Sequence, residues 1–214
     1  MAIKPILFNT EMVRAILDGR KTCTRRAIEL PENMDGVPVG KSGDSSNPLG
    51  FMYPGGIKRP PYQPGDILYV RETWCALPVN EAGHMRGHSI YYYRADGDLR
   101  PEGWRGKWRQ SIHMPKEAAR IWLKVTDVRV ERLQDITPKG AESEGVGNLF
   151  YDDIGYGEKN YGTEVDTEYG IAKEQFAWLW ESTIKKSDLD RYGWDANPWV
   201  WVIEFERCEK SQGR

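Results

Sequence analysis

A short basic segment near the start of the chain combines residue types suited to proton transfer and nucleophilic attack. Gly19 opens it, and its four cations are Arg20, Lys21, Arg25 and Arg26. Alternation along a strand after the glycine turn places Thr22, Thr24 and Arg26 on one face, with Lys21 leaning over that face from the corner. Lysine beside a threonine hydroxyl is a base–nucleophile pair if burial lowers the lysine pKa. A solvated turn is the alternative reading of this basic run.

The elements around this segment follow from hydrophobic periodicity and turn residues. An apolar run over residues 3–8 predicts a strand, and Asn9 or Thr10 is suited to cap a helix that ends near Asp18. Gly19 stands where a helix-terminating glycine belongs. The segment 22–28 then predicts a second strand, so Lys21 lies at the corner between two elements.

Further strands and helices are expected along the rest of the chain. The strands are predicted at residues 67–74, 89–94, 120–133 and 199–205. Thr137 and Pro138 are typical of a helix start, so a short helix is predicted to about Glu144 with Gly145 ending it. A longer helix is predicted over 171–184. Residues 31–65 hold seven prolines and seven glycines and predict a long loop, as do residues 148–169.

Composition limits the class of protein. The chain has 214 residues, of which 39% are hydrophobic and 12% aromatic, which is enough to form a core. Thirty Lys and Arg against 32 Asp and Glu give a net charge of −2, which excludes a general basic coat for DNA. Three dispersed cysteines argue against a disulfide framework. Without a long apolar run or a secretion signal, we expect a cytoplasmic protein with no membrane span.

The order of these motifs resembles the ASCH domain. The motif from Gly19 to Arg26 (GRKTCTRR), the segment PGDILYV at 64–70 and the closing VIEF strand at 202–205 carry the resemblance. The residues around His113 resemble an ASCH subgroup common in phage and prophage genomes. The resemblance implies an α+β fold, a PUA-like mixed β-barrel with short helices and long loop insertions. It also implies a single domain over 1–214, with insertions at about 31–62, 75–117 and 148–170.

The resemblance also implies a candidate catalytic triad. Members of the family that hydrolyse N(4)-acetylcytidine use a lysine, a threonine and a glutamate. The first two match Lys21 and Thr24, and the glutamate matches Glu144, with Glu142 as its rival. Lys21 would take the proton from Thr24, Thr24 would attack the amide carbonyl, and Glu144 would protonate the leaving amine. This chemistry requires no metal and no cofactor.

Other residues are candidates for binding substrate or RNA. Arg20, Arg25 and Arg26 are expected to hold a phosphate or an oxyanion. Trp104 and Trp108 lie among cations between residues 94 and 109, a pattern suited to single-stranded RNA, although tryptophans anchoring a surface hairpin give the same pattern. Glu72 either lines the barrel cavity or forms a structural ion pair.

Three functions remain open. The first is an RNA- or modified-nucleoside-binding protein that hydrolyses the N-acetyl amide of N(4)-acetylcytidine or a related substrate. The second is a ribonuclease of single-stranded RNA, although none of the three histidines lies near the basic motif. The third is a non-catalytic RNA-binding phage accessory protein.

Overall fold

The computed structural model divides the chain into two compact units. Unit 1 consists of Met1–Asp18, Gly65–Lys124 and Glu206–Arg214, and unit 2 consists of Gly19–Pro64 and Val125–Phe205. The structure describes the chain except residues 33, 79–88, 101, 103–105, 147–168 and 211–214. The candidate basic motif therefore begins at a boundary between units. The prediction of a single domain stays a prediction.

Unit 1 begins with the predicted strand and helix. Strand β1 (Ile3–Leu7) pairs in parallel with β6 (Ile67–Arg71), and β6 pairs antiparallel with the start of β9 (Trp122–Arg132). Proline at position 5 is compatible with an edge strand, because such a strand has unpaired backbone groups on one side. Helix α1 (Thr10–Leu17) follows, with the side chain of Asn9 accepting a hydrogen bond from the Met12 amide. The predicted first strand and first helix are thus confirmed.

A second sheet in unit 1 pairs β7 (Trp74–Pro78) with β8 (Ser89–Tyr93) in antiparallel register. The strand predicted over residues 67–74 is in fact two strands, since β6 ends at Arg71 and β7 starts at Trp74. Three single-turn 3-10 helices complete the unit at Arg94–Asp96, Ser111–His113 and Lys116–Ala118.

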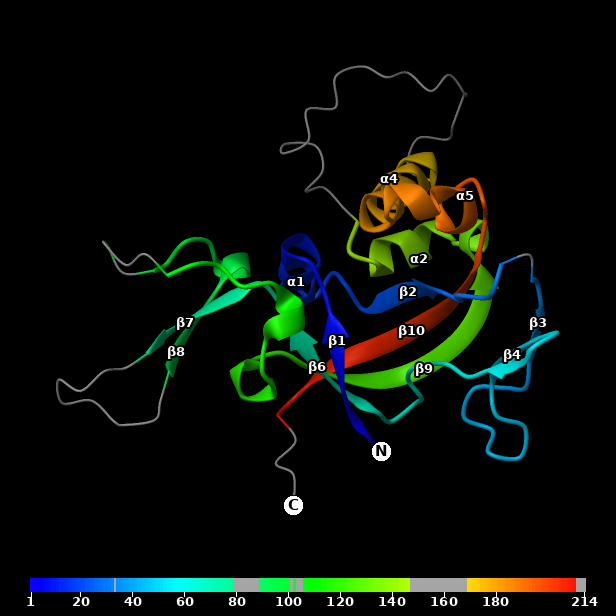
Figure 1. Cartoon of the computed structure of the whole chain (residues 1–214), viewed down its shortest axis with the longest axis horizontal. Coiled ribbons are helices and arrows are strands. Elements are labelled where there is room, and N and C mark those ends of the chain that lie inside the picture. Colours follow the sequence, from blue (N-terminus) through cyan, green and yellow to red (C-terminus); the bar gives the residue numbers. More distant parts are fainter. Residues whose placement is uncertain (33, 79–88, 101, 103–105, 147–168, 211–214) are drawn as a thin grey trace. The chain divides into compact units, whose positions relative to one another are not determined.

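Unit 2 contains most of the two longest strands that the structure describes. Strand β10 (Trp199–Cys208) pairs antiparallel with β2 (Cys23–Ala27), and hydrogen bonds give the strand order β1-β6-β9-β10-β2. Strands β9 and β10 each contribute residues to both units, and their ribbons curve together in Figure 1. Trp201 and Ile203 are buried, as predicted for the closing strand, and so are Val200 and Val202 on its other face.

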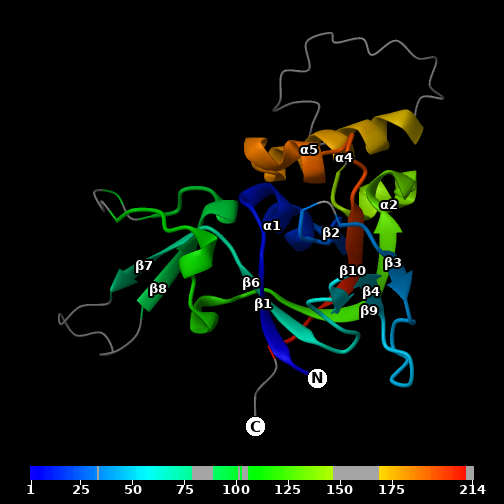
Figure 2. The ribbon, with the colours of Figure 1, turned by 45° about the vertical axis from the view of Figure 1, so that its right-hand side comes forward.

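In unit 2, helices pack against one another and against β2. Helix α2 (Pro138–Ser143) contacts both β2 and helix α4 (Tyr169–Thr183), and the short helix α5 (Leu189–Tyr192) lies near α4 (Figure 2). Single 3-10 turns lie at Leu133–Asp135 and Lys186–Asp188. The Thr137 side chain accepts from the Gly140 amide, and Gly145 has a φ of 90° directly after the helix. The predicted cap and stop of α2 are confirmed.

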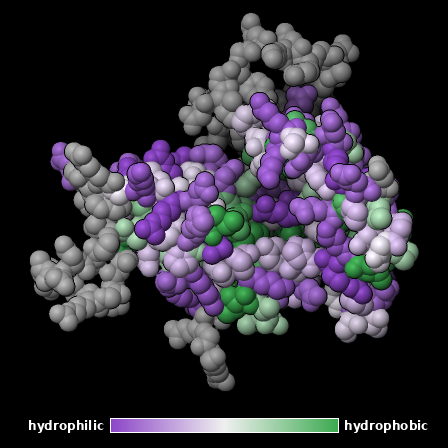
Figure 3. Space-filling model, viewed as in Figure 1, coloured by the Kyte–Doolittle hydropathy of each residue, from purple (hydrophilic) through white to green (hydrophobic). Residues whose placement is uncertain are grey.

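The proline- and glycine-rich segment differs from the predicted long loop. It contains a three-stranded antiparallel sheet of β3 (Val37–Val39), β4 (Gly50–Tyr53) and β5 (Gly56–Lys58). Met52 pairs with both Val37 and Ile57, and all three side chains are about half exposed. Hydrophobic side chains of this sheet appear among polar ones at the surface in Figure 3. The strands are short, so the surrounding turns dominate the composition.

The structure is α+β, with several sheets and few short helices. The predicted loop at 148–169 falls almost entirely outside the described residues. None of the helices that the structure describes has the length and apolar character required to span a membrane.

Candidate functional site

The start of β2 and the end of α2 meet through the backbone of unit 2. Lys21 and Glu144 form an isolated antiparallel bridge, and the Thr22 amide donates to the Ser143 carbonyl at 2.9 Å. Gly19 makes the turn before this bridge with a φ of 77°, a left-handed conformation that glycine adopts without strain. The turn at Gly19 and the end of α2 at Gly145 therefore hold Lys21 and Glu144 side by side.

The side chains of Lys21 and Glu144 are joined directly. The Lys21 Nζ donates to the Glu144 Oε2 at 2.6 Å and to the Glu144 backbone carbonyl at 2.8 Å. The side chains are 0% and 3% exposed. Burial lowers the pKa of Lys21, while the charge and hydrogen bond of Glu144 act in the opposite direction. Lys21 thus releases its proton more readily than an exposed lysine does.

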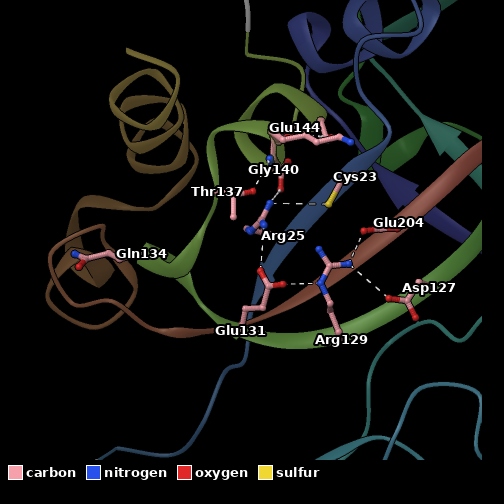
Figure 4. A network of polar contacts seen from close by, with 12 residues as sticks. Cys23, Arg25, Asp127, Arg129, Glu131, Gln134, Thr137, Gly140, Glu144 and Glu204 are labelled. Atoms are coloured by element: carbon pink, nitrogen blue, oxygen red, sulfur yellow. Dashed lines mark hydrogen bonds and ion pairs between the residues drawn. The ribbon is translucent and has the colours of Figure 1, made fainter. Parts of the chain in front are cut away.

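A second cation holds the same carboxylate. Arg25 is buried, and its Nη1 donates to Glu144 Oε1 at 3.2 Å while its Nη2 donates to Glu131 Oε2 at 3.2 Å. Figure 4 shows Arg25 between these two glutamates. A β-carbon at Gly140 would lie 3.2 Å from Arg25 Nη2, so the glycine leaves room for the guanidinium. Arg25 therefore bridges two carboxylates, a role that the sequence did not predict.

Charged residues of β9 and β10 continue the network outward. Arg129 bonds both Glu131 and Glu204, and its Nη1 lies 3.5 Å from Asp127 Oδ2 (Figure 4). Because Glu131 is shared by Arg25 and Arg129, the buried cluster is continuous with a partly exposed one. Arg25 is thereby fixed from both sides of its guanidinium.

Thr24 is buried but is not joined to this pair. Its side chain is on the face of β2 opposite Arg25, because neighbouring strand residues point to opposite faces, and it pairs with Ile203 of β10. Among the residues that the structure describes, the Thr24 hydroxyl makes no hydrogen bond to Lys21 or Glu144. The structure therefore brings Lys21 and Glu144 together. The third predicted catalytic residue, Thr24, is adjacent to Arg25 in β2 but points to the other face of the strand.

Burial distinguishes Glu144 from Glu142, the alternative candidate for the catalytic glutamate. Glu142 is exposed, whereas Glu144 is 3% exposed and contacts both cations. Cys23 lies on the Arg25 face, and burial, followed by the Glu144 charge, raises the pKa of its thiol to about 12. A thiol with this pKa is protonated at neutral pH, so it is a poor nucleophile.

The other predicted binding residues are already engaged or lie apart. The Arg20 Nη1 donates to the Gly145 carbonyl at 2.8 Å, which ties it to the end of α2. Arg26 is half-buried, and burial lowers its pKa while Tyr62 and Glu144 oppose that shift. Arg25 faces carboxylates instead of an open surface.

The remaining candidates belong to unit 1. Glu72 is 1% exposed and accepts two hydrogen bonds from Arg120, at 2.9 and 3.0 Å. The ring of Trp108 has Arg94 at 5.4 Å and Arg100 at 4.8 Å from its centre. This stacking favours the anchoring reading of Trp108. Trp104 lies outside the described residues.

Comparison of the chain with protein-family models, with curated proteins and with solved structures found no match. A buried lysine bonded to a buried glutamate is a pair across which a proton can move, and a lowered lysine pKa favours that movement.

Proposed function

We propose that unit 2 contains the catalytic centre of an ASCH-type, PUA-like hydrolase that cleaves the N-acetyl amide of N(4)-acetylcytidine or a related nucleoside. The observation that carries the proposal is the hydrogen bond between Lys21 Nζ and Glu144 Oε2. These residues are 123 positions apart, and both are buried. The resemblance of the basic motif to the ASCH domain implies this same pairing.

The pair supplies both proton-transfer groups that amide hydrolysis requires. Transfer of one proton from Lys21 to Glu144 across their hydrogen bond leaves a neutral amine and a carboxylic acid. Burial lowers the pKa of Lys21, which favours the loss of its proton. The amine is then a base, and the acid is a proton donor for the leaving nitrogen.

In the proposed reaction, Lys21 takes the hydroxyl proton of Thr24 as the Thr24 oxygen attacks the amide carbonyl. The carbon–nitrogen bond breaks, Glu144 gives its proton to the nitrogen, and an acetyl ester remains on Thr24. Water then hydrolyses the ester and yields acetate. For this step the side chain of Lys21, which precedes β2, must turn toward the face of the strand that carries Thr24 when substrate binds.

Arg25 has a positioning role in this scheme. It contacts Glu144 at Oε1, whereas Lys21 contacts Oε2, so each cation has its own carboxylate oxygen. An arginine keeps its proton at all ordinary pH values. Arg25 therefore orients Glu144 and leaves proton transfer to Lys21.

The test is incubation of the purified full chain with N(4)-acetylcytidine, with cytidine and acetate measured by chromatography. We expect turnover that is abolished by Thr24→Ala and unaffected by EDTA. Thermal unfolding of the variant provides the control for folding. Absence of turnover on both the free nucleoside and acetylated RNA would overturn the proposal.

A binding protein without catalysis is the second candidate. It is favoured by the lack of a hydrogen bond from Thr24 to Lys21 or Glu144 among the described residues. In that case Lys21, Arg25 and Glu144 form a structural ion cluster. Saturable binding of N(4)-acetylcytidine with no product formed would favour this candidate over the hydrolase.

A further inference from the structure

A pocket in unit 2 combines cations with aromatic rings. It has a volume of about 200 Å³, and it lies against the start of β10 and the short helix α5. Its cations are Arg132 and Arg191, its rings are Tyr192 and Trp199, and its apolar wall includes Ile28 and Pro198. Arg132 follows Glu131 on β9, so it points to the face opposite the Arg25 contact. The pocket is therefore distinct from the Lys21–Glu144 site.

Both guanidinium groups of this pocket are held in place. The Arg132 guanidinium carbon lies 4.2 Å from the centre of the Trp199 ring, and its Nη1 donates to the Asn197 carbonyl at 3.1 Å. The Arg191 Nη2 donates to the Leu30 carbonyl at 2.7 Å, and its guanidinium lies 5.2 Å from the Tyr192 ring centre. These contacts use only some of the five N–H groups of each arginine. Each side chain retains donors for a ligand.

The loop that carries Asn197 is itself fixed. Asn197 adopts a φ of 44°, and its side-chain oxygen accepts from the Gln134 amide at 2.8 Å. The Gln134 side chain donates in turn to the Trp194 carbonyl at 2.9 Å. The Arg132 guanidinium is thus positioned by a braced loop, which lowers the entropic cost of binding an anion.

The charge of the pocket is positive. Two cations and one carboxylate line it, and the carboxylate is Asp35. Asp35 Oδ2 is 3.7 Å from Arg132 Nη2, and its side chain is 73% exposed. Such a long, exposed ion pair is weak, so an incoming anion competes with it easily.

One polar atom of the pocket wall has no partner. The Nε1 of Trp199 is buried and makes no hydrogen bond to any part of the chain that the structure describes. An unpaired buried donor is uncommon and calls for an acceptor such as an ordered water. Because this nitrogen is buried, binding of a ligand in the pocket depends on the donors of the two arginines.

We propose that this pocket binds a nucleotide, with its phosphate accepting hydrogen bonds from Arg132 and Arg191 and its base against the flat guanidinium and ring surfaces. Arginine and aromatic planes are the surfaces on which unpaired bases stack, and guanidinium groups bind phosphate oxygens. With a volume of about 200 Å³, the pocket is too small for a duplex. The proposal does not depend on hydrolysis at Glu144.

The test is competition binding with the purified full chain. A fluorescently labelled single-stranded RNA is the probe, followed by anisotropy, and the competitors are CMP, cytidine and inorganic phosphate. We expect CMP to compete more strongly than either cytidine or phosphate, since only CMP offers both base and phosphate. Equal competition by phosphate, or equal competition by cytidine, would overturn the nucleotide assignment.

Three variants assign the binding to this pocket. Arg191→Gln should weaken CMP binding about tenfold or more, because a hydrogen bond to a charged group is lost. Asp35→Asn should strengthen it roughly twofold to fivefold by removing the competing carboxylate. Lys41→Gln, which removes an exposed charge of unit 2 outside the pocket, is the matched control and should leave CMP binding unchanged. Equal effects of Arg191→Gln and Lys41→Gln, or no effect of either, would overturn the proposal.

Discussion

Each unit buries one glutamate against a cation, but the two cations differ in chemistry. In unit 1, Glu72 accepts two hydrogen bonds from Arg120, whose side chain is 26% exposed and stacks 4.0 Å from the centre of the Tyr93 ring. In unit 2, Glu144 accepts from Lys21, whose side chain is fully buried. Asp96 shares the charge of Arg120, whereas Arg25 adds a second cation at Glu144.

This difference separates a structural ion pair from a pair able to move a proton. Arginine does not lose its proton in proteins, so the Glu72–Arg120 pair can only hold its two segments together. Burial raises the pKa of Glu72, and the Arg120 hydrogen bonds act against that rise. Lysine titrates readily when buried, and burial lowers the pKa of Lys21. The chemistry is therefore expected at Glu144 and not at Glu72.

The largest effect should come from removing the Glu144 carboxylate. Glu144→Ala leaves Lys21 as a buried cation without its carboxylate and should cost about 3–5 kcal/mol in the free energy of unfolding. Glu72→Ala leaves Arg120 partly exposed beside Asp96 and should cost less, roughly 1–3 kcal/mol. Urea unfolding measures both. Equal losses would remove the distinction between the two pairs.

Removing Lys21 should have a smaller effect and a characteristic pH dependence. Glu144 keeps Arg25 in Lys21→Met, so we expect a loss of roughly 1–3 kcal/mol at neutral pH. In the wild type, the unfolded chain binds the Lys21 proton more tightly than the folded chain does. Between the lowered pKa and 10.5, the Lys21 contribution to the free energy of unfolding therefore rises with pH.

The contribution of Lys21 is isolated by subtracting the unfolding free energies of Lys21→Met from those of the wild type, pH by pH. The difference should increase by up to about 1.4 kcal/mol per pH unit within that window. A difference that stays constant with pH would mean that the pKa of Lys21 is the same in the folded and unfolded chains.

Removing the Thr24 hydroxyl should change the free energy of unfolding very little. In Thr24→Val a methyl group replaces a buried hydroxyl that makes no hydrogen bond to Lys21 or Glu144 among the described residues, so a change below about 1 kcal/mol is expected. Turnover should nevertheless be lost with the hydroxyl. A destabilisation as large as that of Glu144→Ala would show instead that the hydroxyl is part of the structural network.

The smallest effect concerns cysteine alkylation in the native protein. Cys23 is buried with a pKa of about 12, whereas Cys208 is only half-buried. Iodoacetamide at pH 8 should therefore label Cys208 well before Cys23, since the thiolate is the reactive form. Mass spectrometry of the digested protein locates the label. Equally fast labelling of Cys23 would contradict its burial beside the negative charge of Glu144.

Local sequence patterns predict the elements around the candidate site well. The Asn9 cap, the left-handed Gly19 and the Thr137–Pro138 helix start each reflect a preference of one or two residues, and each is present. The sheet of β3, β4 and β5 was missed because strands of three or four residues lie among many prolines and glycines. Pairing between such short strands is decided by tertiary contacts more than by propensity.

The candidate site was only partly predictable. Lys21 and Thr24 stand out because of their spacing, but the meeting of Lys21 with Glu144 was implied by a resemblance and by no local pattern. Arg25 was expected to bind phosphate. It is instead buried against Glu144 and Glu131, because β2 packs against α2 and β9. Charge type is readable from a sequence, whereas the partner of a charge is a property of the fold.

The most direct test compares turnover of N(4)-acetylcytidine by three variants that each change one side chain of the two pairs: Lys21→Met, Glu144→Gln and Glu72→Gln. Folding of each is checked by circular dichroism. We expect the first two variants to lose turnover and Glu72→Gln to retain it at close to the wild-type rate. Retained turnover in Lys21→Met or Glu144→Gln would contradict the claim that this buried pair moves the protons of the reaction.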